Sequence, residues 1–189
     1  NHAQALALAA RQRSIPAWIV MPSNAPQIKQ DAVADYGATI VLCEPTLAAR
    51  ETTAAEIVAR QRATFIHPYN NARVIAGQAT VGVEILKQVP QLDAIVAPVG
   101  GGGLLAGITL AAKEINPSIR VYGAEPTGAD DAWRSKQAGE LIPQLNPVTI
   151  ADGLLTSLGD LTWPVVRDLV DDIICVKDDE IAIAMRLML

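Results

Sequence analysis

The sequence predicts an α/β protein in which parallel sheets lie between flanking helices in three layers. Three observations lead to this prediction. Short apolar runs of strand length alternate with longer segments of helical periodicity along the whole chain. Half of the 189 residues are hydrophobic, which is enough for a sizeable core. Four consecutive glycines, residues 100–103, separate an apolar run from a predicted helix, as expected where a buried strand turns into a helix.

The first third of the chain alternates helices with short strands. The opening helix is rich in alanine and leucine and begins near Asn1, which suits an N-cap, and Gly37 is a stop signal for the second helix. The predicted helices span residues 3–13, 27–36 and 46–62. The predicted strands span residues 17–21, 38–43 and 64–66.

The remaining chain continues the alternation after a polar loop near residues 67–72. Its first helix carries an apolar stripe made of Val74, Val81, Ile85 and Val89. Thr162 and Asp178 are predicted N-caps of the last two helices. The predicted helices span residues 72–88, 104–115, 132–137 and 163–170, with another from 178. The predicted strands span residues 94–99, 120–124 and 173–176. We therefore expect a small lobe, residues 1–68, and a larger lobe, residues 69–189.

Composition argues against several classes of partner. The net charge is −5 and no basic patch stands out, so neither nucleic acid nor an anionic membrane surface is an expected partner. No apolar run reaches the length of a membrane span, and no signal peptide is visible. The two cysteines, Cys43 and Cys175, lie on separate predicted strands, which favours reduced, buried thiols. These features predict a cytoplasmic enzyme.

Both ends of the chain lack the usual signals. The sequence opens at Asn1 rather than at a methionine, and it closes in an apolar helix without a glycine stop. We therefore expect it to be the middle of a longer protein, incomplete at both ends.

The glycine run predicts a phosphate site. Glycines cost backbone entropy, so a fold keeps four in a row only where side chains do not fit. At a strand-to-helix turn they let main-chain N–H groups converge on an anion at the positive end of a helix. The alternative is a tight turn with close packing of the helix on the sheet, which needs one or two glycines.

A dinucleotide is one phosphate-bearing ligand to consider. Gly101, Gly103 and Ala106 fit the pattern G-x-G-x-x-A after a strand, and Glu125 ends the next strand, where a ribose-binding acid belongs. This hypothesis leaves Gly100, Gly102 and the small lobe unexplained. A nucleotide-binding or non-catalytic α/β domain therefore stays as an alternative.

Further motifs occur in a fixed order along nearly the whole chain. They are residues 1–5 (NHAQA), 25–29 (APQIK), 36–38 (YGA), 74–78 (VIAGQ), 100–107 (GGGGLLAG), 124–131 (AEPTGADD), 149–153 (TIADG) and 163–164 (WP). Together they resemble the fold-type II pyridoxal-phosphate enzymes, specifically the group of serine racemase and threonine/serine dehydratases. The resemblance implies a two-lobed fold like that of the tryptophan synthase β subunit, with pyridoxal 5'-phosphate bound by the larger lobe.

The resemblance also implies roles for particular residues. The cofactor phosphate would be held by Gly100, Gly101, Gly102 and Gly103 together with the N–H of Leu104. Asn1 would bind the phenolic oxygen of the cofactor ring, and the main chain at Gly153 would lie near that ring. The helix that opens at Asn1 and His2 would face the substrate carboxylate. From residue type alone, Asn1 is equally well an ordinary N-cap.

A divalent cation site is implied in the same way by Glu125, the carbonyl of Ala129 and Asp131. Mg²⁺ and Ca²⁺ prefer carboxylate and carbonyl oxygens of this kind. The alternative is that Asp130 or Asp131 caps the following helix.

The reaction implied is loss of ammonia from L-serine, L-threonine or a related 3-hydroxy amino acid, which leaves a 2-oxo acid. Racemisation with the same cofactor is the alternative. The family's Schiff-base lysine precedes the motif that begins here at Asn1, so we expect no catalytic residue within this chain and no activity from these 189 residues alone. The intact protein is expected to be a homodimer. Tyr69 does not match a fixed residue type of the group and is expected to influence substrate choice.

Overall fold

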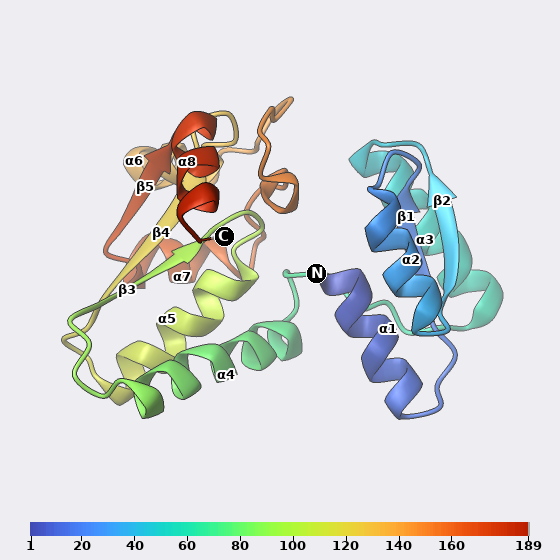
Figure 1. Ribbon diagram of the computed structural model, residues 1–189, viewed down its shortest axis with the longest axis horizontal. Coiled ribbons are helices and arrows are strands. Elements are labelled where there is room, and N and C mark those ends of the chain that lie inside the picture. The colour runs from blue at the N-terminus through green and yellow to red at the C-terminus, as the bar shows by residue number, and fades with distance from the viewer. Residues whose placement is uncertain (189) are drawn as a thin grey trace. The chain divides into compact units, whose positions relative to one another are not determined.

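The structure, a computed structural model, describes residues 1–188 and divides into two compact units (Figure 1). The first unit is Asn1–Ile66 and the second begins at His67. The sequence placed the division between residues 68 and 69. Each unit contains its own parallel sheet with helices packed beside it.

The first unit is built on a two-stranded parallel sheet. Strand β1 (Trp18–Pro22) pairs with β2 (Thr39–Cys43), with Trp18 opposite Thr39. Its helices are α1 (His2–Gln12), α2 (Gln27–Asp35) and α3 (Leu47–Gln61). The buried core consists of Ala7, Ile19, Met21 and Val33. The predicted helices and the first two predicted strands are therefore present in this unit.

The predicted strand over residues 64–66 is wrong. These residues form neither helix nor strand, and Phe65 is half exposed. A strand needs a neighbouring strand to accept its main-chain hydrogen bonds, and β-propensity does not supply one. The carbonyl of Ile66 lies 3.2 Å from Nε2 of His2 at the start of α1 instead.

The second unit contains three parallel strands in the order β3-β4-β5. They are β3 (Ala94–Pro98), β4 (Arg120–Pro126) and β5 (Asp172–Val176). Pro98 lies opposite Ala124 and Ala124 opposite Ile174, so the carboxyl ends of all three strands meet at one edge. The helices are α4 (Ala72–Gln88), α5 (Gly103–Ile115), α6 (Asp131–Ala138), α7 (Trp163–Leu169) and α8 (Asp178–Met188).

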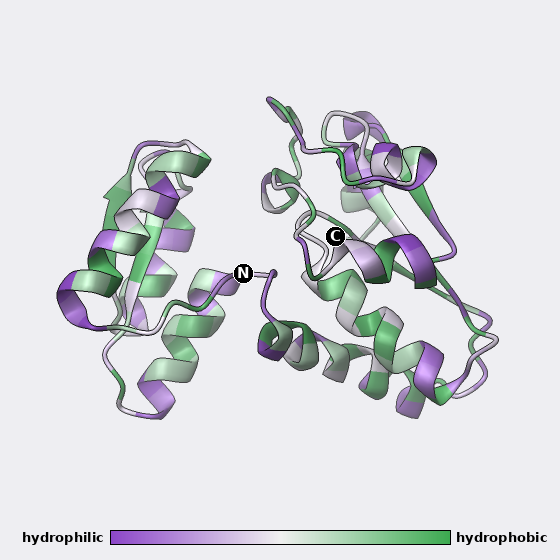
Figure 2. Ribbon diagram, turned by 180° about the vertical axis from the view of Figure 1, so that it is seen from behind, coloured by the Kyte–Doolittle hydropathy of each residue, from purple (hydrophilic) through white to green (hydrophobic). Residues whose placement is uncertain are grey.

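The core of the second unit lies on one face of its sheet. Ile95, Val121 and Ile173 point into a buried cluster that includes Leu105 of α5 and Val166 of α7. Apolar residues dominate α5, which is drawn largely in green in Figure 2. The opposite face is open, since Val96 is 59% and Ile174 45% exposed. This alternation along each strand follows from the two-residue period of a sheet.

The predicted apolar stripe of α4 is only partly right, since Ile85 packs against the core but the buried residues lie one position further along the chain. The residues that α4 buries are Ile75, Gly82 and Leu86, whereas Val81 and Val89 are 36% and 49% exposed. The prediction rested on the large valines and left out Gly82, so the predicted face is displaced from the buried one.

Close approach of two helices explains why the glycine is buried. A Cβ on Gly107 of α5 would lie 2.6 Å from the carbonyl oxygen of Ile75, and one on Gly82 would lie 3.0 Å from that of Ile108. The backbones of α4 and α5 are therefore nearly in contact, which only small residues allow. This contact fixes the position of α5, and with it the loop that precedes α5.

Candidate functional site

The glycine run forms the turn between β3 and α5, as the sequence predicted. Gly102 is the N-cap of α5 and has φ +83°, which favours glycine. A Cβ on Gly101 would lie 2.3 Å from the ring of Tyr69, and one on Gly102 would lie 2.8 Å from Cδ2 of Leu158. Close packing on two sides therefore requires glycine here, so the glycines alone do not identify a ligand.

The main-chain donors of this loop give the stronger indication. The nearest N–H groups that the protein uses are those of Val99, which donates to the carbonyl of Ala124 (2.9 Å), and of Ala106, which donates to that of Gly102 (2.8 Å). The N–H of Leu105, between the predicted donors and Ala106, also has no acceptor within residues 1–188. Within residues 1–188, no hydrogen bond to a protein acceptor is made by the five N–H groups of Gly100, Gly101, Gly102, Gly103 and Leu104. Helix α5 also has no side-chain cap. Five donors at a helix N-terminus form a site that suits a phosphate.

Gly153 lies beside this loop. It belongs to a single 3₁₀ turn, Asp152–Leu154, whose main chain passes next to Gly100. A Cβ on Gly100 would lie 3.1 Å from Cα of Leu154 and 3.4 Å from the carbonyl oxygen of Gly153. The second unit thus brings together six of the predicted cofactor residues, namely the four glycines of the run, Leu104 and Gly153.

The remaining predicted cofactor residue, Asn1, and the predicted substrate residue His2 belong to the first unit. Asn1 is the N-cap of α1, and its side chain makes no capping hydrogen bond. His2 opens the helix, with Nε2 near the Ile66 carbonyl. An asparagine at the N-cap that leaves the helix N–H groups uncapped is compatible with a ligand at this end of α1.

The loop after β4 has a different design, because Glu125 closes the N-terminus of α6. Its Oε1 accepts a hydrogen bond from the N–H of Trp133 (2.6 Å) and its Oε2 one from Ala132 (3.3 Å). Asp130 is the N-cap by position, yet its side chain makes no capping bond and pairs with Arg134 at 2.8 Å. The alternative that Asp130 or Asp131 caps this helix is therefore wrong: the capping carboxylate is that of Glu125.

Glu125 and Asp131 form a pair of buried carboxyl groups. Each residue is 1% exposed, and Oδ2 of Asp131 accepts the N–H of Leu158 at 2.9 Å. Burial raises the pKa of Glu125 to about 8; the charge of Asp131 adds to this effect and the N–H bonds oppose it. Burial likewise raises the pKa of Asp131 to about 6, against the effect of the Leu158 N–H.

The predicted cation ligands are this pair of carboxyl groups and the main-chain carbonyl of Ala129. Ala129 is buried, and no hydrogen bond found within the described chain uses its carbonyl oxygen. Residues 1–188 contain no group of three or more His, Cys, Asp or Glu side chains arranged for a metal ion. The predicted ligands comprise only two carboxylates and one main-chain carbonyl oxygen. A cation bound here would therefore need that carbonyl and water molecules to complete its coordination.

The dinucleotide hypothesis does not fit this geometry. It needs the carboxylate of Glu125 at a ribose hydroxyl. Instead, Glu125 is buried and both of its oxygens accept N–H groups of α6.

Two side chains near the glycine loop were not predicted as site residues. The Thr162 hydroxyl donates to the carbonyl of Gly101 at 2.8 Å, and Asn70 Oδ1 accepts the N–H of Leu161 at 2.8 Å. Thr162 is the N-cap of α7, as predicted, but its side chain does not cap that helix. The sequence did indicate that the Thr162 hydroxyl has another partner. Pro164 in the first turn of α7 lacks one of the N–H groups that an N-cap side chain usually binds.

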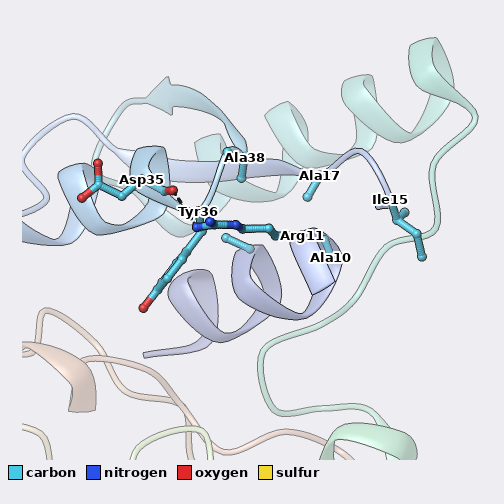
Figure 3. Close-up of a pocket in the computed structure, with 9 residues that line it drawn as sticks. Ala10, Arg11, Ile15, Ala17, Asp35, Tyr36 and Ala38 are labelled. Carbon is cyan, nitrogen blue, oxygen red and sulfur yellow. Dashed lines mark hydrogen bonds between the residues drawn. The ribbon is translucent and has the colours of Figure 1, made fainter. Parts of the chain in front are cut away.

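A cavity of about 230 Å³ lies within the first unit (Figure 3). Arg11 and Tyr36 line it, and Nη1 of Arg11 donates to the carbonyl of Asp35 at 3.2 Å. None of the residues that line it is a predicted site residue. Elsewhere, Cys43 and Cys175 are both free thiols, but each is partly exposed rather than buried as predicted. No helix of the described chain has the length and apolar character needed to cross a membrane.

Comparison with known proteins identifies relatives over the full length of the chain. A family model described as "Pyridoxal-phosphate dependent enzyme" matches residues 1–189. Serine racemase of Arabidopsis thaliana is 52% identical over 187 residues, which cover 99% of this chain and 56% of that protein. Human serine racemase is 50% identical over 189 residues, which cover 100% of this chain and 56% of that protein.

Solved structures agree with these relatives. The structure of maize serine racemase superposes with a TM-score of 0.96 at 52% identity, over 98% of this chain and 56% of that one. A threonine deaminase from T.th. gives a TM-score of 0.94 at 41% identity, over 99% of this chain and 62% of that one. The chain spans about half the length of the curated relatives it matches. It belongs to the fold-type II family of pyridoxal-phosphate-dependent enzymes.

Proposed function

We propose that the protein carrying this chain is a pyridoxal-phosphate-dependent ammonia-lyase. It converts L-serine, L-threonine or a related 3-hydroxy amino acid into a 2-oxo acid and ammonia. The observation that carries the proposal is the set of five N–H groups without a protein acceptor within residues 1–188, at the start of α5, in a member of this family. When bound, the cofactor supplies an electron sink for the negative charge left on Cα after proton loss.

The chain's own residues bind and orient. By the resemblance, the N–H groups of Gly100 to Gly103 and of Leu104 would hold the cofactor phosphate, and the main chain at Gly153 would lie near the ring. Asn1 would hydrogen-bond the phenolic oxygen of the ring. The first turn of α1, with Asn1 and His2, binds the substrate carboxylate through its N–H groups, because the positive end of a helix dipole attracts an anion.

In this proposal the base that moves the substrate proton is a lysine outside these 189 residues, because by the resemblance none of the chain's lysines matches the Schiff-base position. Those lysines are Lys29, Lys87, Lys113, Lys136 and Lys177. Lys113 is held by Asp171 at 2.9 Å and by the carbonyl of Ile119 at 2.7 Å. Lys136 donates to three carbonyls at the end of α7, with the shortest bond, 2.6 Å, to that of Val170. Both ammonium groups are thus engaged within the second unit. We therefore expect the 189 residues alone to be inactive.

A divalent cation, Mg²⁺ or Ca²⁺, binds at Glu125, Asp131 and the carbonyl of Ala129. Two carboxyl groups buried side by side, and a carbonyl oxygen that accepts no hydrogen bond from the described chain, support this assignment. A cation would offset the cost of burying two like charges. The ion has a structural role in the proposal, since it holds the loop that precedes α6.

Racemisation is the second candidate activity. The curated relatives that are 50 to 53% identical carry the name serine racemase, while the threonine deaminase structure is 41% identical. The binding residues serve both outcomes, which differ only in whether the β-hydroxyl leaves or a proton returns to Cα. A homodimer follows from the resemblance, and a cytoplasmic location stays a prediction from composition.

The test is an assay of the whole protein, reconstituted with pyridoxal phosphate, on L-serine and L-threonine. We expect 2-oxo acid and ammonia in equal amounts. Chiral chromatography measures D-serine in the same reaction, and D-serine as the main product would favour the racemase. Absence of both products, together with tight binding of NAD and none of pyridoxal phosphate, would overturn the proposal.

A further inference from the structure

The side of the glycine loop that faces the protein is held by the side chain of Thr162. This residue is fully buried, and its Oγ1 accepts the N–H of Gly159 at 2.9 Å. Its single hydroxyl hydrogen has two carbonyls within reach, that of Gly101 at 2.8 Å and that of Gly159 at 3.1 Å. The shorter contact goes to the glycine run, which lies 61 positions away in the sequence.

Peptide geometry gives this contact a consequence. In a planar trans peptide the C=O and the following N–H point in opposite directions. When the carbonyl of Gly101 points at Thr162, the N–H of Gly102 must point away from it. The carbonyl of Gly102 is held in the same manner by the N–H of Ala106, which directs the N–H of Gly103 out of the helix end. Two of the five donors are thus oriented by bonds to the carbonyls that precede them.

The segment that carries Thr162 is itself anchored. Leu158 donates its N–H to Asp131 (2.9 Å), and Leu161 donates its N–H to Asn70 (2.8 Å). A Cβ on Gly159 would lie 2.5 Å from Cγ of Asn70, so that contact is tight. A residue on a segment fixed at several points can define the direction of another peptide group.

We infer that Thr162 is a positioning residue for phosphate binding, through its hydrogen bond to the carbonyl of Gly101. It does not touch the phosphate; it orients the Gly102 peptide so that the N–H faces the anion. The inference rests on the proposed function in placing a phosphate at the glycine loop. It goes further in assigning part of the affinity to a hydroxyl group on the opposite side of that loop.

The experiment compares pyridoxal 5'-phosphate with pyridoxal, which lacks the phosphate, on the whole protein. Dissociation constants are measured by equilibrium dialysis, and their ratio isolates the phosphate contribution. Thr162→Val removes the hydroxyl and keeps the shape, and we expect it to reduce the preference for the phosphate form about tenfold, the effect of one hydrogen bond. Thr162→Ser, which keeps the hydroxyl, should restore the preference to within about twofold of that of the unaltered protein.

A matched control is Thr109→Val. Thr109 is also fully buried in the second unit, and its hydroxyl donates to the carbonyl of Leu105 at 2.7 Å, within α5 and not to a carbonyl of the glycine run. Its loss should leave the ratio of the two dissociation constants unchanged. Should Thr162→Val fail to fold, Thr162→Ala, which is smaller, is measured in its place.

The outcomes separate the inference from the proposed function. If the unaltered protein prefers the phosphate form and Thr162→Val keeps the full preference, the inference is wrong and the proposed function stands. An equal loss of affinity for both compounds would also overturn it, because that result indicates a general structural effect. If the unaltered protein shows no preference for the phosphate form, both are overturned.

Discussion

Two neighbouring strands of the second unit end at the same edge of the sheet and lead into helices with opposite designs. After β3, the glycine loop leaves the N-terminus of α5 open, with five N–H groups that no protein acceptor uses within residues 1–188. After β4, the carboxylate of Glu125 closes the N-terminus of α6 by accepting two N–H groups.

The difference shows how one fold can present helix ends suited to opposite charges. An open helix end offers donors and a positive dipole to an anion. A helix end closed by a buried carboxylate leaves negative charge nearby, and with Asp131 beside it the site favours a cation or a proton. The same topology thus places a candidate anion site and a candidate cation site on adjacent loops of one sheet.

A side chain added to the glycine loop before α5 should have the largest effect of the changes considered, on both stability and cofactor affinity. Gly101→Ala places a methyl group 2.3 Å from the ring of Tyr69, so that ring or the loop must move. We expect the free energy of unfolding to fall by about 3 kcal/mol and the affinity for pyridoxal phosphate to fall more than about tenfold. Denaturant unfolding and equilibrium dialysis measure the two effects.

Gly77→Ala is the matched control for that substitution. Gly77 lies in α4, and a Cβ there would meet nothing within 4 Å. Alanine at this position should raise stability by up to about 1 kcal/mol, because glycine is a poor helix former. Similar losses in both variants would show that close packing at the glycine loop is not the cause.

The closed end is tested by removing its cap. Glu125→Ala leaves the N–H groups of Ala132 and Trp133 without an acceptor, and we expect a loss of about 2 kcal/mol in the free energy of unfolding. Glu114→Ala, an exposed acid on α5, should change stability by less than about 0.5 kcal/mol. A Glu125→Ala variant as stable as the unaltered protein would mean that α6 does not depend on this carboxylate.

Cation binding should depend on Asp131 and not on its neighbour Asp130. The main-chain N–H of Trp133 binds Glu125, so this tryptophan is close enough to sensitise Tb³⁺ emission, with Ca²⁺ or Mg²⁺ as competitor. We expect Asp131→Asn to weaken binding about tenfold, the effect of one lost charged ligand. Asp130→Asn, at a residue that pairs with Arg134, should bind normally. Equal binding by both variants would remove Asp131 from the site.

The smallest effect concerns a carboxylate at the opposite end of the sheet. Asp171 accepts hydrogen bonds from the N–H of Val121 (2.7 Å) and from Lys113 (2.9 Å). Burial acts to raise its pKa, but these two partners outweigh burial and hold the pKa below its usual value. The folded pKa is thus below the unfolded one, which is about 4. The stability that Asp171 contributes is present above that pH and is lost as the pH falls through the folded pKa.

Asp171→Asn should therefore cost less than about 1 kcal/mol at neutral pH and reduce the loss of stability in acid. Unfolding measured between neutral pH and about pH 2 checks this, with the exposed acid variant Asp93→Asn as control. A steeper acid loss in Asp171→Asn than in the unaltered protein would reverse the sign we assign.

Much of the fold could be predicted from periodicity. The order of helices and strands, the parallel pairing and the position of the glycine loop all followed from local patterns. The errors arose where a partner decides the structure. Residues 64–66 have β-propensity but no neighbouring strand in the described chain, and the buried face of α4 is centred on Gly82 because α5 lies against it.

The candidate site was also predicted only in part. Motif resemblance identified the glycine run, Gly153, Glu125 and Asp131 as a set, and these residues do lie on loops of the second unit or at the ends of its elements. It did not indicate that Glu125 caps α6 or that Thr162 bonds to the glycine loop. Both are contacts between a side chain and a main-chain group of another segment, which residue types do not specify.

Local patterns in the chain were enough to establish a parallel α/β protein of the pyridoxal-phosphate family, because short-range periodicity and ordered motifs need no knowledge of distant contacts. Only the tertiary structure showed which main-chain N–H groups at the helix ends have a protein acceptor and which do not. That outcome depends on packing between distant segments, such as Thr162 against a loop 61 residues earlier, and each buried donor is satisfied by whichever acceptor the fold brings within reach.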